Sequence, residues 1–161
     1  MDVNESIVST WLNENGYFIL NNIYYGQFHS DIDILAVNLN KRIILDCEIK
    51  IRTGSTKISN NDNKQNGFLH ICNQLNSEIR KNKVISLIGT DKGFKQKKLL
   101  ITTRSFFGSS LENRKKWFKQ FRAHGIKVQF IEGIVYSLER KASRQKISSN
   151  EVMQILRLRN L

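Results

Sequence analysis

The hydrophobic and polar positions in the first third of the chain change from a helical to a strand periodicity. Apolar residues in 2–14 recur at the 3.6-residue spacing of a helix, and Asn15-Gly16 provides a stop. Residues 17–25 are rich in aromatic and branched side chains, which predicts a strand. Two further strands are predicted at 31–38 and 42–51, joined by a short polar turn. These three strands form an antiparallel meander.

After a polar loop at 53–63, the second part of the chain predicts helices that alternate with strands. A helix over 63–82 buries one apolar face made of Phe68, Ile71, Cys72, Leu75 and Ile79. The later elements are strands at 84–88 and 99–103 around a basic tip at 91–98, a helix at 110–124, a strand at 127–131, and short helices at 133–141 and 150–159. This order predicts an α/β fold in which helices flank both faces of a mixed central sheet.

A chain of 161 residues is long enough for one domain with one buried core. We expect a single domain over 1–161, with a motif-bearing core in about 1–104 and a basic extension of the same domain in about 105–161. Cys47 and Cys72 lie in apolar patterns, which predicts reduced, buried thiols. With no signal-peptide pattern and no membrane-spanning apolar run, an intracellular, cytoplasmic location is expected.

The net charge of +12 predicts a polyanionic partner, either nucleic acid or an anionic membrane surface. The charge is unevenly distributed, because residues 1–50 carry a net charge of −4 and residues 51–161 carry +16. The basic residues concentrate in four clusters, at 92–98, 114–122, 140–146 and 157–159. Within 110–124, Lys115, Lys119 and Arg122 form a basic stripe, and Leu111, Phe118 and Phe121 are expected to face inward.

A row of charged residues lies on the third predicted strand. Alternation places Ile43, Leu45, Cys47, Ile49 and Ile51 on one apolar face, which leaves Asp46, Glu48 and Lys50 together on the other. The preceding strand contributes Asp31 and Asp33 on one face, and an antiparallel hairpin brings this strand alongside Glu48.

Paired carboxylates beside a lysine suit a hard divalent cation. We expect Asp33, Glu48 and the Ile49 carbonyl to bind Mg²⁺, with Mn²⁺ as a substitute, and Lys50 to hold or deprotonate the attacking water. This is the chemistry of phosphodiester hydrolysis. The alternative is a surface ladder of cross-strand ion pairs, in which Lys50 only neutralises Asp46 or Glu48.

These residues resemble the signature of the PD-(D/E)XK nucleases, with Asp33 followed by Ile34-Leu35-Ala36-Val37 and then by Glu48-Ile49-Lys50. Isoleucine at position 32 stands where the family name has proline, and Asp31 is a rival for Asp33. Glu5, Gly16-Tyr17 and Lys64-Gln65 also match the family's elements in the right order. With them, about the first eighty residues resemble archaeal Holliday-junction resolvases and the small bacterial YraN-like proteins. The sequence beyond Lys83 resembles no specific family motif.

The resemblance implies a restriction-endonuclease-like core and a metal-dependent DNA endonuclease that selects branched or Holliday-junction DNA, as in recombination and repair. Glu5 and Gln65 would assist catalysis. From the residues alone, Glu5 fits a capping box with Asp2 equally well. Gln65 starts the buried face of its helix, where its amide could hydrogen-bond the region of Asp46 or Glu48. The alternative is a solvated glutamine in the first turn.

Phosphate contacts are expected from exposed basic residues, which makes binding largely independent of sequence and sensitive to salt. The candidates are His29, Arg52, Lys57, Lys64, Lys95, Lys97, Lys98, Lys115, Lys119 and Arg122. The partner is duplex or branched DNA, with no membrane and no small-molecule cofactor, and two-strand cleavage would suit a homodimer. Two other functions stay open: a restriction-type or mobile-element endonuclease whose specificity comes from a partner, and a non-catalytic nucleic-acid-binding module on the same fold.

Overall fold

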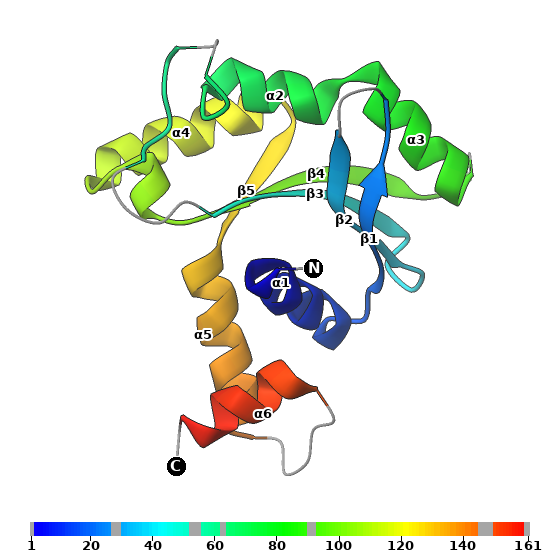
Figure 1. Cartoon of the computed structure of the whole chain (residues 1–161), viewed down its shortest axis with the longest axis vertical. Coiled ribbons are helices and arrows are strands. Elements are labelled where there is room, and N and C mark those ends of the chain that lie inside the picture. Colours follow the sequence, from blue (N-terminus) through cyan, green and yellow to red (C-terminus); the bar gives the residue numbers. More distant parts are fainter. Residues whose placement is uncertain are drawn as a thin grey trace.

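The protein is a five-stranded mixed sheet covered by helices on both faces (Figure 1). The computed structural model describes residues 2–26, 30–51, 56–61, 64–89, 93–144 and 150–159. In chain order the elements are α1 (Val3–Glu14), β1 (Phe18–Tyr24), β2 (Asp31–Asn38), β3 (Ile43–Lys50), α2 (Phe68–Asn76), α3 (Glu78–Ile88), β4 (Lys95–Thr102), the 3₁₀ turn η1 (Ser105–Phe107), α4 (Leu111–Ala123), β5 (Ile126–Phe130), α5 (Ile131–Ala142) and α6 (Glu151–Leu158).

The strands are arranged in the order β1-β2-β3-β4-β5. The first three are antiparallel and form the predicted meander, whereas β3, β4 and β5 are parallel. Helices α2, α3 and α4 lie over one face of the sheet, and α1 and α5 lie on the other side, where α6 packs against both of them (Figure 1). The predicted mixed α/β architecture is therefore confirmed.

The face of the sheet toward α1 carries the apolar row that alternation predicts on β3. Leu45 and Cys47 are buried there against Leu12 of α1 and Ile134 of α5. The other members of the row, Ile43, Ile49 and Ile51, pack against the same core. Since this apolar row of β3 faces α1, the charged side chains of the same strand point to the opposite face, toward α2 and α3.

The opposite face buries aromatic side chains between the sheet and α4. Phe107 and Phe121 stack with their ring centroids 5.7 Å apart. Trp117 and Phe121 are the buried residues of α4, while Leu111 is 60% exposed and Phe118 is 37% exposed. The expectation that Leu111 faces inward is therefore wrong. Phe118 lies at the edge of the core, where its ring contacts Phe107 and Phe130, and Trp117 is more deeply buried.

The segment predicted as one helix followed by a strand is two helices. Ser77 interrupts the helix and begins α3, since its hydroxyl accepts a hydrogen bond from the backbone N–H of Arg80. Residues 84–88, predicted as a strand from their branched side chains, are the second half of α3, and Val84 packs on Ile32 and Leu35. Tertiary packing outweighs local β propensity here. The break also leaves Ile79 61% exposed instead of buried.

Strand β4 begins at Lys95, four residues before the predicted start. Its first three residues are exposed and polar, so they lack the apolar signal by which a strand is recognised. As a result, Lys95, Lys97 and Lys98 lie on a strand of the sheet and not on a basic tip.

Both cysteines are free and buried, as predicted. Burial raises the pKa of the Cys47 thiol above its ordinary value and that of Cys72 to about 11, so both stay protonated near neutral pH. Within the described ranges, no helix combines the length and the apolar character needed to cross a bilayer.

The orientation of α4 can be tested by truncating one buried and one exposed side chain. Phe121→Ala should lower the free energy of unfolding by about 3 to 5 kcal/mol, because it leaves a cavity in the aromatic core. Leu111→Ala, on the exposed side, should change it by less than about 0.5 kcal/mol. Urea denaturation of both variants measures the difference, and equal losses would contradict this placement of α4.

Candidate active site

Strands β2 and β3 part at the end that carries the charged residues. Their paired register ends at Ile34 and Cys47. Beyond that point the Asp33 carboxylate occupies the place of a backbone acceptor, since the Ile49 N–H donates to Asp33 Oδ2 at 2.5 Å. Asp33 is therefore fixed beside the backbone of residues 48–50.

The three residues predicted to carry the chemistry come together here. Lys50 Nζ lies 2.7 Å from Glu48 Oε1, and the Lys50 side chain is 24% exposed whereas that of Glu48 is 2% exposed. Asp33 is half-buried on the neighbouring strand. The site thus has an accessible side at Lys50 and a closed side behind Glu48.

The closed side is formed by Arg80 of α3, which is completely buried. Its Nε and Nη2 donate to Asp46 Oδ1 at 2.9 and 2.7 Å, and its Nη1 donates to Glu48 Oε2 at 2.7 Å. Burial disfavours the charged guanidinium, but the hydrogen bonds and charges of Asp46 and Glu48 outweigh this effect and raise the Arg80 pKa. Asp46 and Glu48 therefore belong to a buried ion-pair network and not to a surface ladder, although Lys50 does pair with Glu48 as that alternative expected.

Sequence reasoning missed Arg80. The one available signal was indirect: two acids on a strand with an otherwise apolar environment require a buried cation. With 26 lysines and arginines in the chain, that requirement does not select one residue. Arg80 meets the two acids because a new helix begins after Ser77, which places residue 80 in the first turn of α3.

The glutamine that contacts the site is Gln74 of α2, whose Nε2 donates to Glu48 Oε1 at 2.9 Å. Gln65, which was expected to open the buried face of this helix, lies in an exposed turn before α2 begins. The expectation that Gln65 contacts the region of Asp46 or Glu48 is therefore wrong, and Gln65 is the solvated glutamine of the alternative, because the helix begins at Phe68.

Glu5 caps its own helix. Its carboxylate accepts from the Asp2 N–H at 3.3 Å, and its N–H donates to Asp2 Oδ1 at 2.8 Å, which completes a capping box. In the part of the chain that the structure describes, Glu5 makes no polar contact with Asp33 or Glu48. The structure thus has the capping-box arrangement that was one of the two readings of Glu5.

The environment of Asp33 disfavours its negative charge. Burial raises the pKa of Asp33 to about 7, and the neighbouring Glu48 charge adds to this rise. The Ile49 N–H and Lys50 act in the opposite direction. A second cation near the two carboxylates would relieve the remaining repulsion.

The donor set fits a divalent cation held by few protein ligands. Among the described residues no three His, Cys, Asp or Glu side chains gather closely enough to hold a metal ion. The side-chain ligands for a cation would therefore be two carboxylates, those of Asp33 and Glu48. The second oxygen of Asp33 accepts no hydrogen bond from the described part of the chain. In a strand the N–H and C=O of one residue point to the same neighbour, so the Ile49 carbonyl also points toward the Asp33 side.

The predicted nucleic-acid contacts are distributed over several elements. Those that are exposed are Lys57, Lys64, Lys95, Lys97, Lys115, Lys119 and Arg122. Lys98 is partly buried, and its Nζ donates to Asn76 Oδ1 at 2.5 Å. His29 and Arg52 lie outside the described residues.

A basic groove of about 880 Å³ runs between α4 and the first residues of β4 and β5. The cations that line it are Lys97, Lys98, Lys119, Arg122 and Lys127. Four of these five were expected to contact phosphate, and Lys127 was missed because it was assigned only to the start of a strand. The groove borders the amino-terminal half of β4, whereas Lys50 pairs with Thr102 at the other end of that strand.

The ion-pair network predicts a large effect of removing its central base. Arg80→Ala leaves Asp46 and Glu48 buried without their partner, so the free energy of unfolding should fall by about 3 to 5 kcal/mol. The neighbouring exposed Lys81→Ala should change it by less than about 0.5 kcal/mol. Urea denaturation compares the two variants, and equal stabilities would refute the role given to Arg80.

The raised pKa of Asp33 makes the stability of the metal-free protein depend on pH. The folded state binds this proton more tightly than the unfolded chain, so the contribution favours folding at low pH and is lost as pH rises through about 7. Asp33→Asn does not titrate and should gain stability relative to the wild type as the pH rises from about 4 to about 7, by at most about 1.4 kcal/mol per pH unit, with no further gain above that range. Urea denaturation of both proteins across this range measures the gain, and a constant difference would show that the Asp33 pKa is not raised.

Comparison with known protein families and with curated proteins gives no match. Among solved structures, the chain is similar to one described as "Crystal Structure of Protein of Unknown Function AF1548", with a TM-score of 0.50 and 16% sequence identity. The similarity covers 96% of this chain and 76% of that chain. At this identity the likeness shows a shared fold alone.

Proposed function

We propose that this protein is a metal-dependent endonuclease that hydrolyses phosphodiester bonds in DNA. The observation that supports the proposal is the meeting of Asp33, Glu48 and Lys50 where β2 and β3 part. Acids on adjacent strands with an accessible lysine beside them match the donors that this reaction requires.

Asp33, Glu48 and the Ile49 carbonyl would hold Mg²⁺, or Mn²⁺ in its place. When bound, such a cation lowers the pKa of a coordinated water and neutralises charge that develops on the phosphate. Lys50 Nζ is partly exposed, and it can donate a hydrogen bond to the attacking water and orient it toward phosphorus.

Arg80 and Gln74 act on the reaction through Glu48. Together they hold both Glu48 oxygens, one from α3 and the other from α2. Fixing a ligand carboxylate in this way limits its rotation and keeps its charge directed at the opening beside Lys50. Both are therefore positioning residues.

Exposed cations on several elements favour a polyanionic substrate. Lys57 and Lys64 lie in the segment between β3 and α2, and the basic groove lies at the far end of β4, so a nucleic acid that reaches the site can also contact cations remote from it. Contacts of this kind recognise backbone geometry more than base sequence. We therefore favour a structure-selective enzyme that acts on branched DNA.

A second candidate function is a nucleic-acid-binding protein without turnover. One observation favours it: both Glu48 oxygens already accept hydrogen bonds, and Lys50 Nζ lies against Oε1, where a cation would compete with it. In this case the carboxylates would serve only the ion-pair network.

Cleavage assays with Mg²⁺ on linear, flapped and four-way DNA distinguish the two candidates. Lys50→Ala should lower the cleavage rate by at least about a hundredfold, because it removes the group that orients the water. Glu48→Gln should lower it similarly, provided that thermal melting shows the variant to be folded.

Lys83→Ala on α3 is the matched control, and it should cleave like the wild type. Binding without Mg²⁺-dependent cleavage would support the second candidate. Cleavage that persists in Lys50→Ala and in a folded Glu48→Gln would contradict the assignment of this site.

A further inference from the structure

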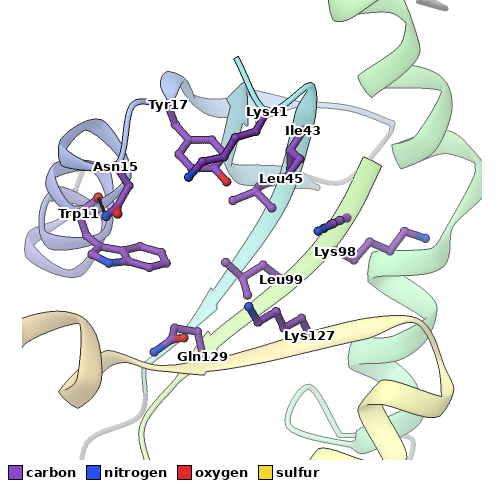
Figure 2. A pocket seen from close by; sticks show the side chains of 11 residues that line it. Trp11, Asn15, Tyr17, Lys41, Ile43, Leu45, Lys98, Leu99, Lys127 and Gln129 are labelled. Carbon is purple, nitrogen blue, oxygen red and sulfur yellow. Dashed lines mark hydrogen bonds between the residues drawn. The ribbon is translucent and has the colours of Figure 1, made fainter. Parts of the chain in front are cut away.

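A second cavity lies on the opposite face of the sheet, between α1 and the starts of β3, β4 and β5 (Figure 2). Its volume is about 220 Å³. This is below the roughly 300 Å³ at which sites for drug-sized molecules begin, so it suits a fragment about as large as one nucleobase. Ile43, Leu45 and Leu99 form its apolar floor.

Two aromatic side chains form the walls of this cavity. Trp11 of α1 and Tyr17, just before β1, point into it from different sides (Figure 2). Lys41 Nζ lies 6.0 Å from the centre of the Tyr17 ring. Aromatic walls over an apolar floor favour a flat ring that can stack against them.

The cavity also offers hydrogen-bonding groups at its edge. Gln129 donates to its neighbouring carbonyl through Nε2 at 3.3 Å, which leaves its Oε1 as an acceptor. Asn15 uses Nδ2 for the Trp11 carbonyl at 2.7 Å, which leaves its Oδ1. The Trp11 indole N–H has no acceptor among the described residues. Amide and indole groups of this kind can pair with the edge of a base.

The rim of the cavity is basic and carries no acid. Lys97 and Lys127 line both this cavity and the basic groove on the other face, so they stand between the two. Neither lysine has a carboxylate partner in the part of the chain described by the structure. Lys98 lines the cavity too, but its side chain extends away toward α2 (Figure 2). An anionic group seated at the rim would meet Lys97 and Lys127.

We propose that this cavity is a binding site for one unpaired nucleotide, with the base between Trp11 and Tyr17 and the phosphate on Lys97 and Lys127. The nucleotide can belong to a nucleic-acid strand, whose next phosphates then follow Lys119 and Arg122 in the groove, or it can be a free mononucleotide. Both sources present the same ring and phosphate.

The proposed pocket and the candidate active site are separate. Leu45 faces the pocket, and the adjacent Asp46 faces Arg80 on the other side of β3. Nucleotide binding here requires neither a metal nor turnover, so the proposal stands independently of cleavage. It can be tested with a metal chelator present, where failure of the proposed nuclease activity has no influence on the result.

Trp11 fluorescence provides the readout, since the chain has two tryptophans and Trp117→Phe leaves Trp11 as the only one. The probes are the four deoxynucleoside monophosphates, a short single-stranded oligothymidylate and a blunt duplex of equal length. We expect saturable quenching by the oligothymidylate and little by the duplex, whose bases are paired. Quenching by monophosphates as well would identify a site for free nucleotides.

Charge reversal at the rim tests the location of the phosphate. Lys127→Glu should weaken binding of the quenching probe by about tenfold or more, since it removes a cation from the phosphate and adds a repelling charge. Lys83→Glu on α3 makes the same change at a residue that lines neither the cavity nor the groove, and it should alter binding by less than about twofold. Absence of quenching by every probe, or equal effects of the two reversals, would overturn the proposal.

Discussion

The contact between the Arg80 guanidinium and the carboxylates of Asp46 and Glu48 is the interaction on which the rest of the site depends. Strand β3 lies in the centre of the sheet, and both acids are 1% exposed. Two carboxylates in that environment would be strongly destabilising without a cation at hydrogen-bonding distance. Arg80 provides it and, because it belongs to α3, the same contact fixes that helix against the sheet.

Glu48 therefore belongs to two systems at once. Its Oε2 faces the closed interior and Arg80, while its Oε1 faces Lys50 and the opening. Among the described residues, Asp33 makes no hydrogen bond with Arg80, and its carboxylate accepts one hydrogen bond, from the Ile49 N–H. The pair thus consists of one carboxylate held at both oxygens and one whose pKa is raised by burial to about 7.

Most of the sheet and the pair of acids could be predicted from the sequence because strand alternation is a local property. The apolar row of β3 and the antiparallel hairpin that brings Asp33 alongside Glu48 follow from the order of residues alone. The two helices that complete the site could not be predicted in this way. Their break at Ser77 is a short polar signal inside a helical pattern, and Gln74 and Arg80 reach β3 across more than twenty residues of intervening chain. The misplaced glutamine and the missed arginine share this cause.

Because side chains alternate along β3, substitutions at its even and odd positions affect different faces of the sheet. Even-numbered positions from Ile44 to Lys50 face the ion-pair network, and odd-numbered positions from Ile43 to Ile51 face the α1 side with its cavity. A substitution at an even-numbered position affects the odd-numbered side chains only through the backbone, and the reverse also holds. The two surfaces can therefore acquire or lose their chemistry independently, although they share a single strand.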